Sequence, residues 1–235
     1  MKSYFTLITI PSLLQAKNLK DRFNSINQSQ NNGMRALNIA LVGDLEDIDN
    51  YGCWCHFAEN WTYGRGNPVD EYDMECQKVL RGYECIRMDD VDENGGPSTC
   101  VPYELNYDEP LNIDHTFTDE FLISTCTNNN NNGNDAFCKI RSCIVESFFV
   151  RNIALLDNSN LQPNPSFRAD NGFDFDATCG VHAPGASGKA CCGSYPTRFP
   201  YQTRGGDIQC CQNKHVYNDV LFNCCQDGTV EISCL

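Results

Sequence analysis

The sequence predicts a disulfide-rich α+β fold, in which a mainly helical first part is followed by a small cysteine-rich module of strands and loops. Three observations support this prediction. The 235 residues include 16 cysteines, the first half carries apolar residues at helical spacing, and the second half has short apolar runs between turn residues. Length alone fits either one large domain or two ordinary ones.

The cysteines divide into two groups of eight. They are Cys53, Cys55, Cys76, Cys85, Cys100, Cys126, Cys138 and Cys143, and then Cys179, Cys191, Cys192, Cys210, Cys211, Cys224, Cys225 and Cys234. Between the groups lie residues 157–176, whose Asn, Pro and Asp content is typical of a linker. We therefore predict two disulfide modules, at 34–156 and 177–235, whose connectivity the sequence does not determine.

All sixteen cysteines are expected to be oxidised. Such a density of thiols, with three Cys-Cys pairs, is untenable in a reducing compartment unless the thiols bind metal. Zinc sites use Cys-x2-Cys or histidine at fixed spacings, and the Cys53-x-Cys55 sequence does not match them.

The N-terminus agrees with export from the cell. Residues 1–16 form a candidate signal peptide, because Lys2 precedes an uncharged stretch and Ala16 offers a small residue for cleavage. A short buried segment is the alternative. No later apolar run approaches the roughly 20 residues that a membrane span requires, so we expect a secreted, extracellular protein without a transmembrane segment. In that location Asn27 and Asn60, which begin Asn-x-Ser/Thr sequons, would accept N-glycans.

The net charge of −14 disfavours nucleic acid and anionic membranes as partners and favours cations. One acidic loop is a candidate calcium site. Asp90, Asp92 and Asn94, followed by Gly95, match the first part of an EF-hand loop, although the twelfth position is Val101 instead of the bidentate glutamate. A solvated acidic turn is the alternative. No other cofactor is expected.

Three segments of the first half have apolar residues at helical spacing. They lie at 34–48, after Pro68, and from about Asp135 onward. Pro68 and the acidic residues after it are typical of a helix N-terminus. Because the second and third segments carry cysteines on or near their apolar faces, we expect an antiparallel helix pair braced by disulfides.

Part of this region resembles secreted phospholipases A2. The residues that carry the resemblance are 50–55 (NYGCWC), 64–66 (GRG), 68–73 (PVDEYD), Cys76 and Tyr83, in the order of the family's calcium loop and first active-site helix. Residues 138–146 (CKIRSCIVE) resemble its second long helix, whose acid supports the catalytic histidine. The resemblance covers 34–156 and implies a phospholipase A2-like helical domain.

The catalytic residues that this family requires are missing. Its chemistry needs a histidine base, an aspartate that binds calcium, and a glycine-rich loop. If Cys76 is the first cysteine of the family's pair, Leu80 and Arg81 occupy the His-Asp positions. If Cys76 is the second, Val79 and Leu80 do. Neither register supplies a base or a metal carboxylate.

Two other residues, His56 and Glu146, are candidate catalytic groups. His56 follows the cysteines of the loop, but no acid lies at a spacing that would orient it, so a polar loop histidine is expected. Glu146 occupies the supporting-acid position with no histidine to support, which leaves a surface glutamate or a buried hydrogen-bond acceptor. We predict no catalytic residue and therefore a pseudoenzyme.

The second module is divided by its three Cys-Cys pairs and is expected to form short strands and turns. Asp227-Gly228 is typical of a hairpin turn. Because few large apolar residues are present, disulfides must supply much of the stability. Residues 210–230 resemble the dicysteine repeats of galaxin-like proteins, which are associated with extracellular and skeletal matrices.

These observations predict a non-catalytic structural protein, a disulfide-stapled unit of an extracellular filament, coat or matrix that self-associates into a homo-oligomer or polymer. The first alternative is a lipid- or protein-binding module that uses a phospholipase A2-like groove without turnover. The second is an active calcium-dependent lipase that uses other residues.

Overall fold

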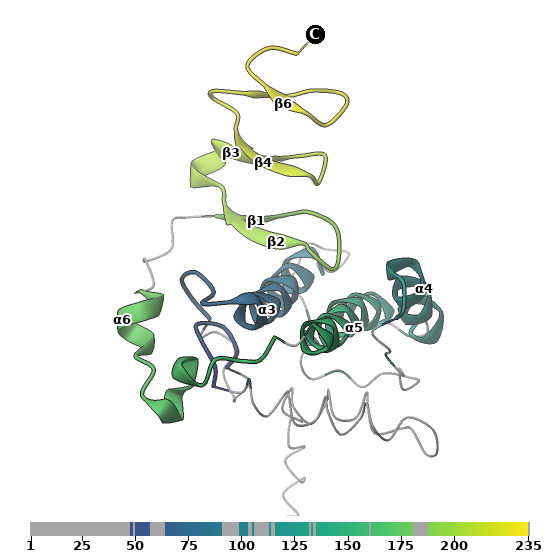
Figure 1. The fold of residues 1–235 in the computed structure, drawn as a ribbon. Coiled ribbons are helices and arrows are strands. Elements are labelled where there is room, and N and C mark those ends of the chain that lie inside the picture. The colour runs from purple at the N-terminus through teal and green to yellow at the C-terminus, as the bar shows by residue number, and fades with distance from the viewer. Residues whose placement is uncertain are drawn as a thin grey trace, which may run out of the picture.

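The computed structural model describes residues 48, 50–56, 64–90, 99–102, 105, 113, 116–131, 133, 135–159, 161–180 and 188–234. Helices and loops up to residue 180 form a helical body, and residues 188–234 form a hairpin tower that rises from it (Figure 1). The fold is therefore α+β and disulfide-rich, as predicted. None of the described helices is long and apolar enough to cross a membrane. The predicted signal peptide and most of the predicted helix at 34–48 lie outside the described residues.

Two long antiparallel helices form the centre of the body, which confirms their predicted positions and orientation. They are α3 (Glu71–Asp89) and α5 (Ala136–Asn158). The Tyr72 hydroxyl lies 2.7 Å from the Asp157 carboxylate at one end of the pair, and Arg141 donates to Asp89 at 3.1 Å at the other. The helices approach closely at Gly82, where an added Cβ would lie 3.0 Å from a Val145 methyl group.

Shorter helices precede and follow α5 in the chain. The helix α4 (Asp119–Asn129) packs against α5 and begins where the Thr118 hydroxyl accepts the Phe121 N–H. Three short helices follow α5, namely η2 (Pro165–Phe167), η3 (Ala169–Asn171) and α6 (Phe175–Cys179).

The stretch whose composition predicts a linker contacts the loop at 50–56. The Gly52 N–H donates to the Phe167 carbonyl at 2.8 Å, and the Ala169 N–H donates to the Asn50 carbonyl at 3.1 Å. Tyr51 and Arg168 also form a β-bridge. These contacts hold the stretch against the body, while the predicted domain boundaries stay predictions.

The expected disulfide bracing between α3 and α5 is wrong. All sixteen cysteines are paired, but each cysteine of α3 and α5 bonds to a segment outside this pair of helices. The bonds are Cys55–Cys76, Cys85–Cys191, Cys100–Cys138 and Cys126–Cys143. Helical spacing predicts that a cysteine is buried, but it does not predict which buried neighbour the cysteine meets.

The two groups of eight cysteines also do not close on themselves. Cys53–Cys179 and Cys85–Cys191 join one group to the other. Two crossing bonds remove two cysteines from each group, which leaves both remaining counts even. The even counts were therefore compatible with either arrangement.

The tower consists of three antiparallel hairpins, which confirms the predicted short strands. The pairs are β1 (Lys189–Cys192) with β2 (Phe199–Gln202), β3 (Ile208–Cys211) with β4 (His215–Asn218), and β5 (Asn223–Cys224) with β6 (Val230–Glu231). The short helix η4 (Arg204–Gly206) connects the first two hairpins. Gly228 adopts φ 84° between β5 and β6, where the hairpin turn was predicted.

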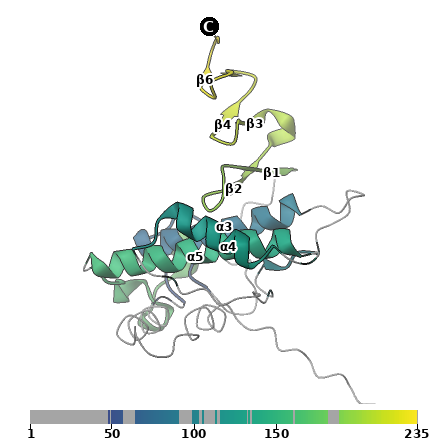
Figure 2. The same cartoon turned by 90° about the vertical axis from the view of Figure 1, so that its right-hand side faces the viewer.

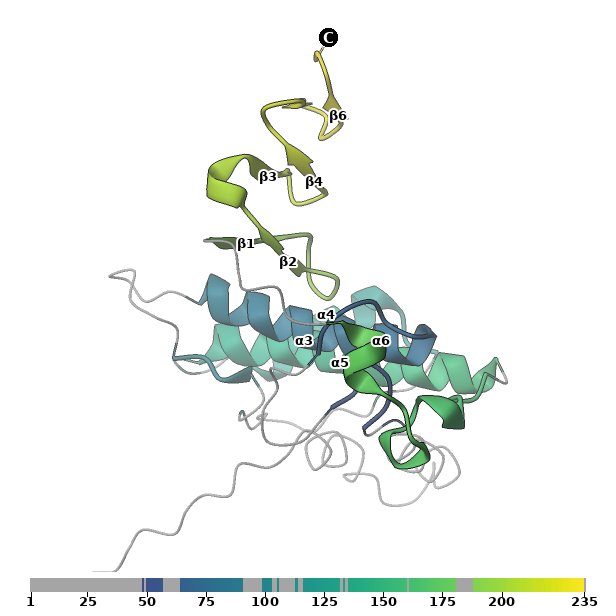
Figure 3. The same cartoon turned by 90° about the vertical axis from the view of Figure 1, so that its left-hand side faces the viewer.

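The views from either side show the hairpins following one another away from α3 (Figures 2 and 3). Four disulfides connect them in series, and we call these bonds the cystine chain. They are Cys85–Cys191, Cys192–Cys210, Cys211–Cys224 and Cys225–Cys234. Successive side chains of a strand point to opposite faces, so in β1 and β3 one cysteine of the pair bonds backward and the other forward. Cys224, at the end of β5, bonds backward and Cys225, directly after it, bonds forward.

Asp89, the last residue of α3, holds the first hairpin on the body. Its carboxylate accepts bonds from Arg198 Nε (2.8 Å) and Nη2 (3.0 Å), from Arg141 (3.1 Å) and from the Tyr195 hydroxyl (3.0 Å). Burial, with the nearby Asp89 charge, raises the pKa of Tyr195, so this hydroxyl stays a donor. The network joins α3, α5 and the β1–β2 turn.

We predict that Asp89→Asn lowers the free energy of unfolding by about 1–3 kcal/mol, because two guanidinium groups lose their shared carboxylate. Denaturant unfolding measures this loss, and hydrogen exchange should accelerate in the β1–β2 turn. The control is Asp170→Asn, since this carboxylate pairs with Arg168 but is 67% exposed. Its effect should stay below about 0.5 kcal/mol. Equal losses in the two variants would contradict the role given to Asp89.

Candidate functional site

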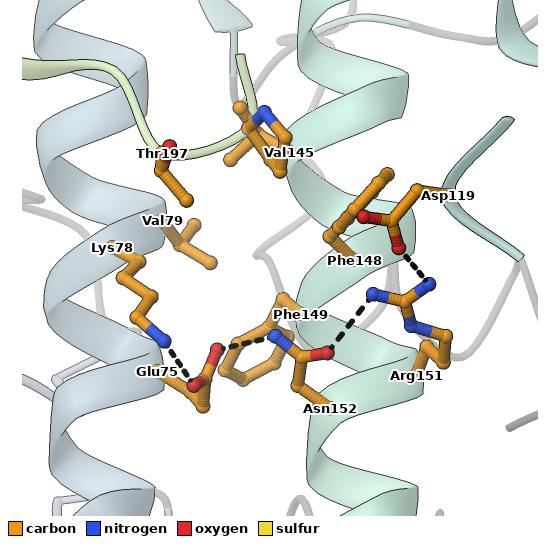
Figure 4. A pocket seen from close by; sticks show the side chains of 11 residues that line it. Glu75, Lys78, Val79, Asp119, Val145, Phe148, Phe149, Arg151, Asn152 and Thr197 are labelled. Atoms are coloured by element: carbon orange, nitrogen blue, oxygen red, sulfur yellow. Dashed lines mark hydrogen bonds and ion pairs between the residues drawn. The ribbon is translucent and has the colours of Figure 1, made fainter. Parts of the chain in front are cut away.

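A pocket of about 280 Å³ lies between α3 and α5, beside the β1–β2 turn (Figure 4). Its floor is apolar and is formed by Val79, Val145, Phe148 and Phe149. Its rim is polar, and Pro196 and Thr197 of the turn close one side. The volume is near the lower end of the range for small-molecule sites.

Hydrogen bonds and ion pairs connect the rim residues in a row (Figure 4). Lys78 lies 2.5 Å from one Glu75 oxygen, and Asn152 donates to the other at 2.8 Å. Arg151 then contacts the Asn152 carbonyl oxygen at 3.4 Å and Asp119 at 2.6 Å. Each charged side chain of the rim thus has a partner of opposite charge. The pocket has the chemistry to take up an apolar group and place a polar end at its rim.

Of the residues at the expected catalytic positions, two are apolar and the third, Arg81, packs against an aromatic ring. Val79 is buried and forms part of the pocket floor, and Leu80 is also buried. The Arg81 guanidinium lies 5.3 Å from the centre of a Trp54 ring, and burial lowers its pKa. In both alignment registers, therefore, the position of the base carries an aliphatic side chain.

Glu146 is fully buried and accepts a hydrogen bond from the Tyr83 hydroxyl at 2.5 Å. This confirms the second of its two expected environments, the buried acceptor. The contact joins α5 to α3 inside the helix pair, and Glu146 is not among the described residues that form the pocket. Its role in this arrangement is to satisfy a buried hydroxyl.

His56 is a loop histidine, as expected. Its Nε2 donates to the Gly52 carbonyl at 3.1 Å, and its ring meets the Phe175 ring edge-on at 5.0 Å. Among the described residues no acid bonds to this imidazole. The histidine therefore helps to close the loop at 51–56.

The candidate calcium loop is described only at its first residue. Asp90 ends α3, and its carboxylate accepts the Cys100 N–H at 3.1 Å. Asp92 and Asn94 lie outside the described residues, as do Asn27 and Asn60 of the sequons. Within the part of the chain that the structure describes, no group of three or more His, Cys, Asp or Glu side chains is arranged to hold a metal ion.

The chain matches no protein-family model, no curated protein and no solved structure. The resemblances to phospholipases A2 and to galaxin-like repeats stay predictions that rest on the residues named for them.

A buried carboxylate that sequence reasoning missed fixes the loop beside the pocket helix. Asp73 is fully buried, and it accepts backbone N–H bonds from Cys53 (2.9 Å), Trp54 (2.7 Å) and Val69 (2.9 Å). Burial raises the pKa of Asp73 although the three donors oppose the shift. The disulfide Cys55–Cys76 ties the same loop to α3. Side chains thus shape the segment that resembles a calcium loop.

Gly52 must stay a glycine for this carboxylate to fit. Its φ is +58°, and an added Cβ would lie 2.5 Å from Asp73 Cγ. We expect Gly52→Ala to lower the free energy of unfolding by about 2–4 kcal/mol, the sum of left-handed backbone strain and a buried clash. Chemical denaturation measures the change.

Gly172→Ala is the matched control. Gly172 has φ +86°, but an added Cβ there would meet nothing within 4 Å, so only the backbone strain of about 1–2 kcal/mol applies. If both alanine variants lose the same stability, the contact between Gly52 and Asp73 carries no energetic weight.

Proposed function

We propose that this chain is a non-catalytic extracellular structural protein, a disulfide-stapled building unit of a filament, coat or matrix. The observation that carries the proposal is the cystine chain, which joins the helical body covalently to each hairpin of the tower. Eight disulfides in 235 residues fit an oxidising, extracellular location. A protein braced in this way resists unfolding and proteolysis, which an extracellular assembly requires.

The pocket supports the absence of turnover. Val79, which occupies the base position in one of the two alignment registers, lies at its floor, and Leu80, which occupies it in the other, is buried. The one hydroxyl among the described pocket residues, that of Thr197, donates to the Ser194 carbonyl at 3.2 Å, and no described pocket residue is a histidine or a cysteine. A hydroxyl nucleophile is commonly activated by an adjacent general base, whereas the Thr197 hydroxyl bonds to a backbone carbonyl. Release of fatty acid from phospholipid in the presence of calcium would contradict this part of the proposal.

The tower supports self-association. Val220, Leu221 and Ile232 are 70%, 61% and 78% exposed near its far end, and the carbonyl of Ile232 accepts a bond from Asn223 in the last hairpin. Residues 188–235 hold four basic and four acidic side chains, so the net charge of −14 belongs to residues 1–187. Contact between tower ends of two copies would bury these apolar side chains and keep the acidic parts apart.

We expect the purified chain to form oligomers in sedimentation velocity and ordered assemblies in electron micrographs. Leu221→Asp should shift the sedimentation profile toward monomer, because it places a charge in the apolar contact. Leu155→Asp is the control, since Leu155 is 43% exposed on α5 and the substitution changes the net charge equally. A wild-type chain that stays monomeric at every ionic strength, with and without calcium, would overturn the structural proposal.

The pocket favours one second candidate, a binding module without turnover. Its apolar floor and paired rim suit the uptake of an acyl group. In that case phosphatidylcholine vesicles should bind saturably, and Thr197→Trp should weaken binding by filling the mouth of the pocket. Ser166→Trp, on an exposed residue away from the pocket, should bind as the wild type does. Vesicle binding that both variants leave unchanged would exclude the pocket as the lipid site.

A further inference from the structure

The arrangement of the cysteines in the tower differs from what hairpin stability alone would require. In each hairpin the paired cysteines lie on or directly after the first strand, and the second strands β2, β4 and β6 contain none. Cys192 lies opposite Phe199, and Cys211 lies opposite His215. A disulfide between the two strands of a hairpin would stabilise it as well. Here three of the bonds connect a hairpin to α3 or to another hairpin, and the fourth, Cys225–Cys234, joins residues that lie just after β5 and β6.

The cystine chain forms a continuous covalent path that avoids the hairpins. From Cys234 the path crosses a disulfide to Cys225, one peptide bond to Cys224, and a second disulfide to Cys211. One further peptide bond leads to Cys210, whose disulfide reaches Cys192. A last peptide bond leads to Cys191, which is bonded to Cys85 of α3. The residues between bonded cysteines therefore lie outside the path.

We propose that the tower is a load-bearing tether, in which tension between its far end and the body passes through the cystine chain and bypasses the strands. The inference deepens the proposed structural function and rests on it. In an ordinary hairpin a pull on the two ends breaks the ladder hydrogen bonds and extends the loop. Here the bonded cysteines lie 18, 13 and 9 positions apart in the chain, and no loop between them can extend while its disulfide is intact.

The body end of the path is built to accept such a load. Cys85 is fully buried in α3, which packs along α5 and is tied to the loop at 51–56 by Cys55–Cys76. Beside it, Arg198 makes two bonds to Asp89, and Lys189 pairs with Glu84 at 2.5 Å. A pull on Cys191 is therefore shared between one disulfide and the contacts of the first hairpin with α3.

Single-molecule force spectroscopy on the full chain tests this path. One handle is attached at a clickable side chain in place of Arg87, which is exposed on α3, and the other at the C-terminus. The wild-type chain should extend without unfolding steps from the tower. Cys211→Ser/Cys224→Ser should add one step of about 40 Å, the extended length of 13 residues less the 5.3 Å that already separates the two Cα atoms. Cys192→Ser/Cys210→Ser should add one of about 60 Å, from 18 residues.

Cys126→Ser/Cys143→Ser is the matched control. It removes a bond that closes 17 residues in the body but lies off the path, so no step of that length should appear. Reductant added to the wild type under load should produce the same tower steps, which keeps the test decisive if a serine variant misfolds. Steps in the oxidised wild type, or equal steps in the control, would overturn the load path. That result would not affect the proposal of a structural function, which is tested separately by the formation of assemblies.

Discussion

Neighbouring side chains of a β-strand point to opposite faces, and the tower depends on this constraint at the Cys-Cys pairs of β1 and β3. One cysteine of a pair therefore bonds to the segment before its hairpin, and the other bonds to the hairpin after it. The hairpins are thus linked covalently one after another. Among the described residues of the tower, the buried apolar side chains are all cysteines, namely Cys192, Cys211 and Cys225. The cystines thus take the place of a hydrophobic core, and a loop of this size closed by a disulfide gains about 3 kcal/mol.

The body obeys a different constraint, the antiparallel packing of α3 and α5. Two buried acids make polar contacts inside it: Glu146 accepts a hydrogen bond from Tyr83, and Asp73 accepts bonds from three backbone N–H groups of the neighbouring loops. The loop at 50–56 is thus shaped by a buried carboxylate and by the disulfide Cys55–Cys76. The pocket beside it has an aliphatic floor at Val79 and a rim whose charges neutralise one another.

The sequence predicted the elements better than their connections. Tyr72, Cys76, Val79 and Tyr83 recur at helical spacing because one face of α3 is buried, so periodicity was enough to find the helix. The partners of the cysteines were not predictable, because each group has an even number of cysteines left to pair whether or not two bonds cross between the groups. From the sequence, Asp73 is explained as an acid in the first turn of a helix. Its role as an acceptor was not predictable, because it depends on the N–H group of Cys53, which lies 20 residues earlier in the chain. The family resemblances and the sites at Asp92, Asn94, Asn27 and Asn60 remain predictions.

Disulfide mapping of the native protein tests the central claim most directly. Partial reduction with differential alkylation distinguishes the two members of each Cys-Cys pair, and mass spectrometry then identifies the linked peptides. The account predicts Cys85–Cys191, Cys192–Cys210, Cys211–Cys224 and Cys225–Cys234. Bonds within a Cys-Cys pair, or bonds confined to each group of eight cysteines, would contradict it.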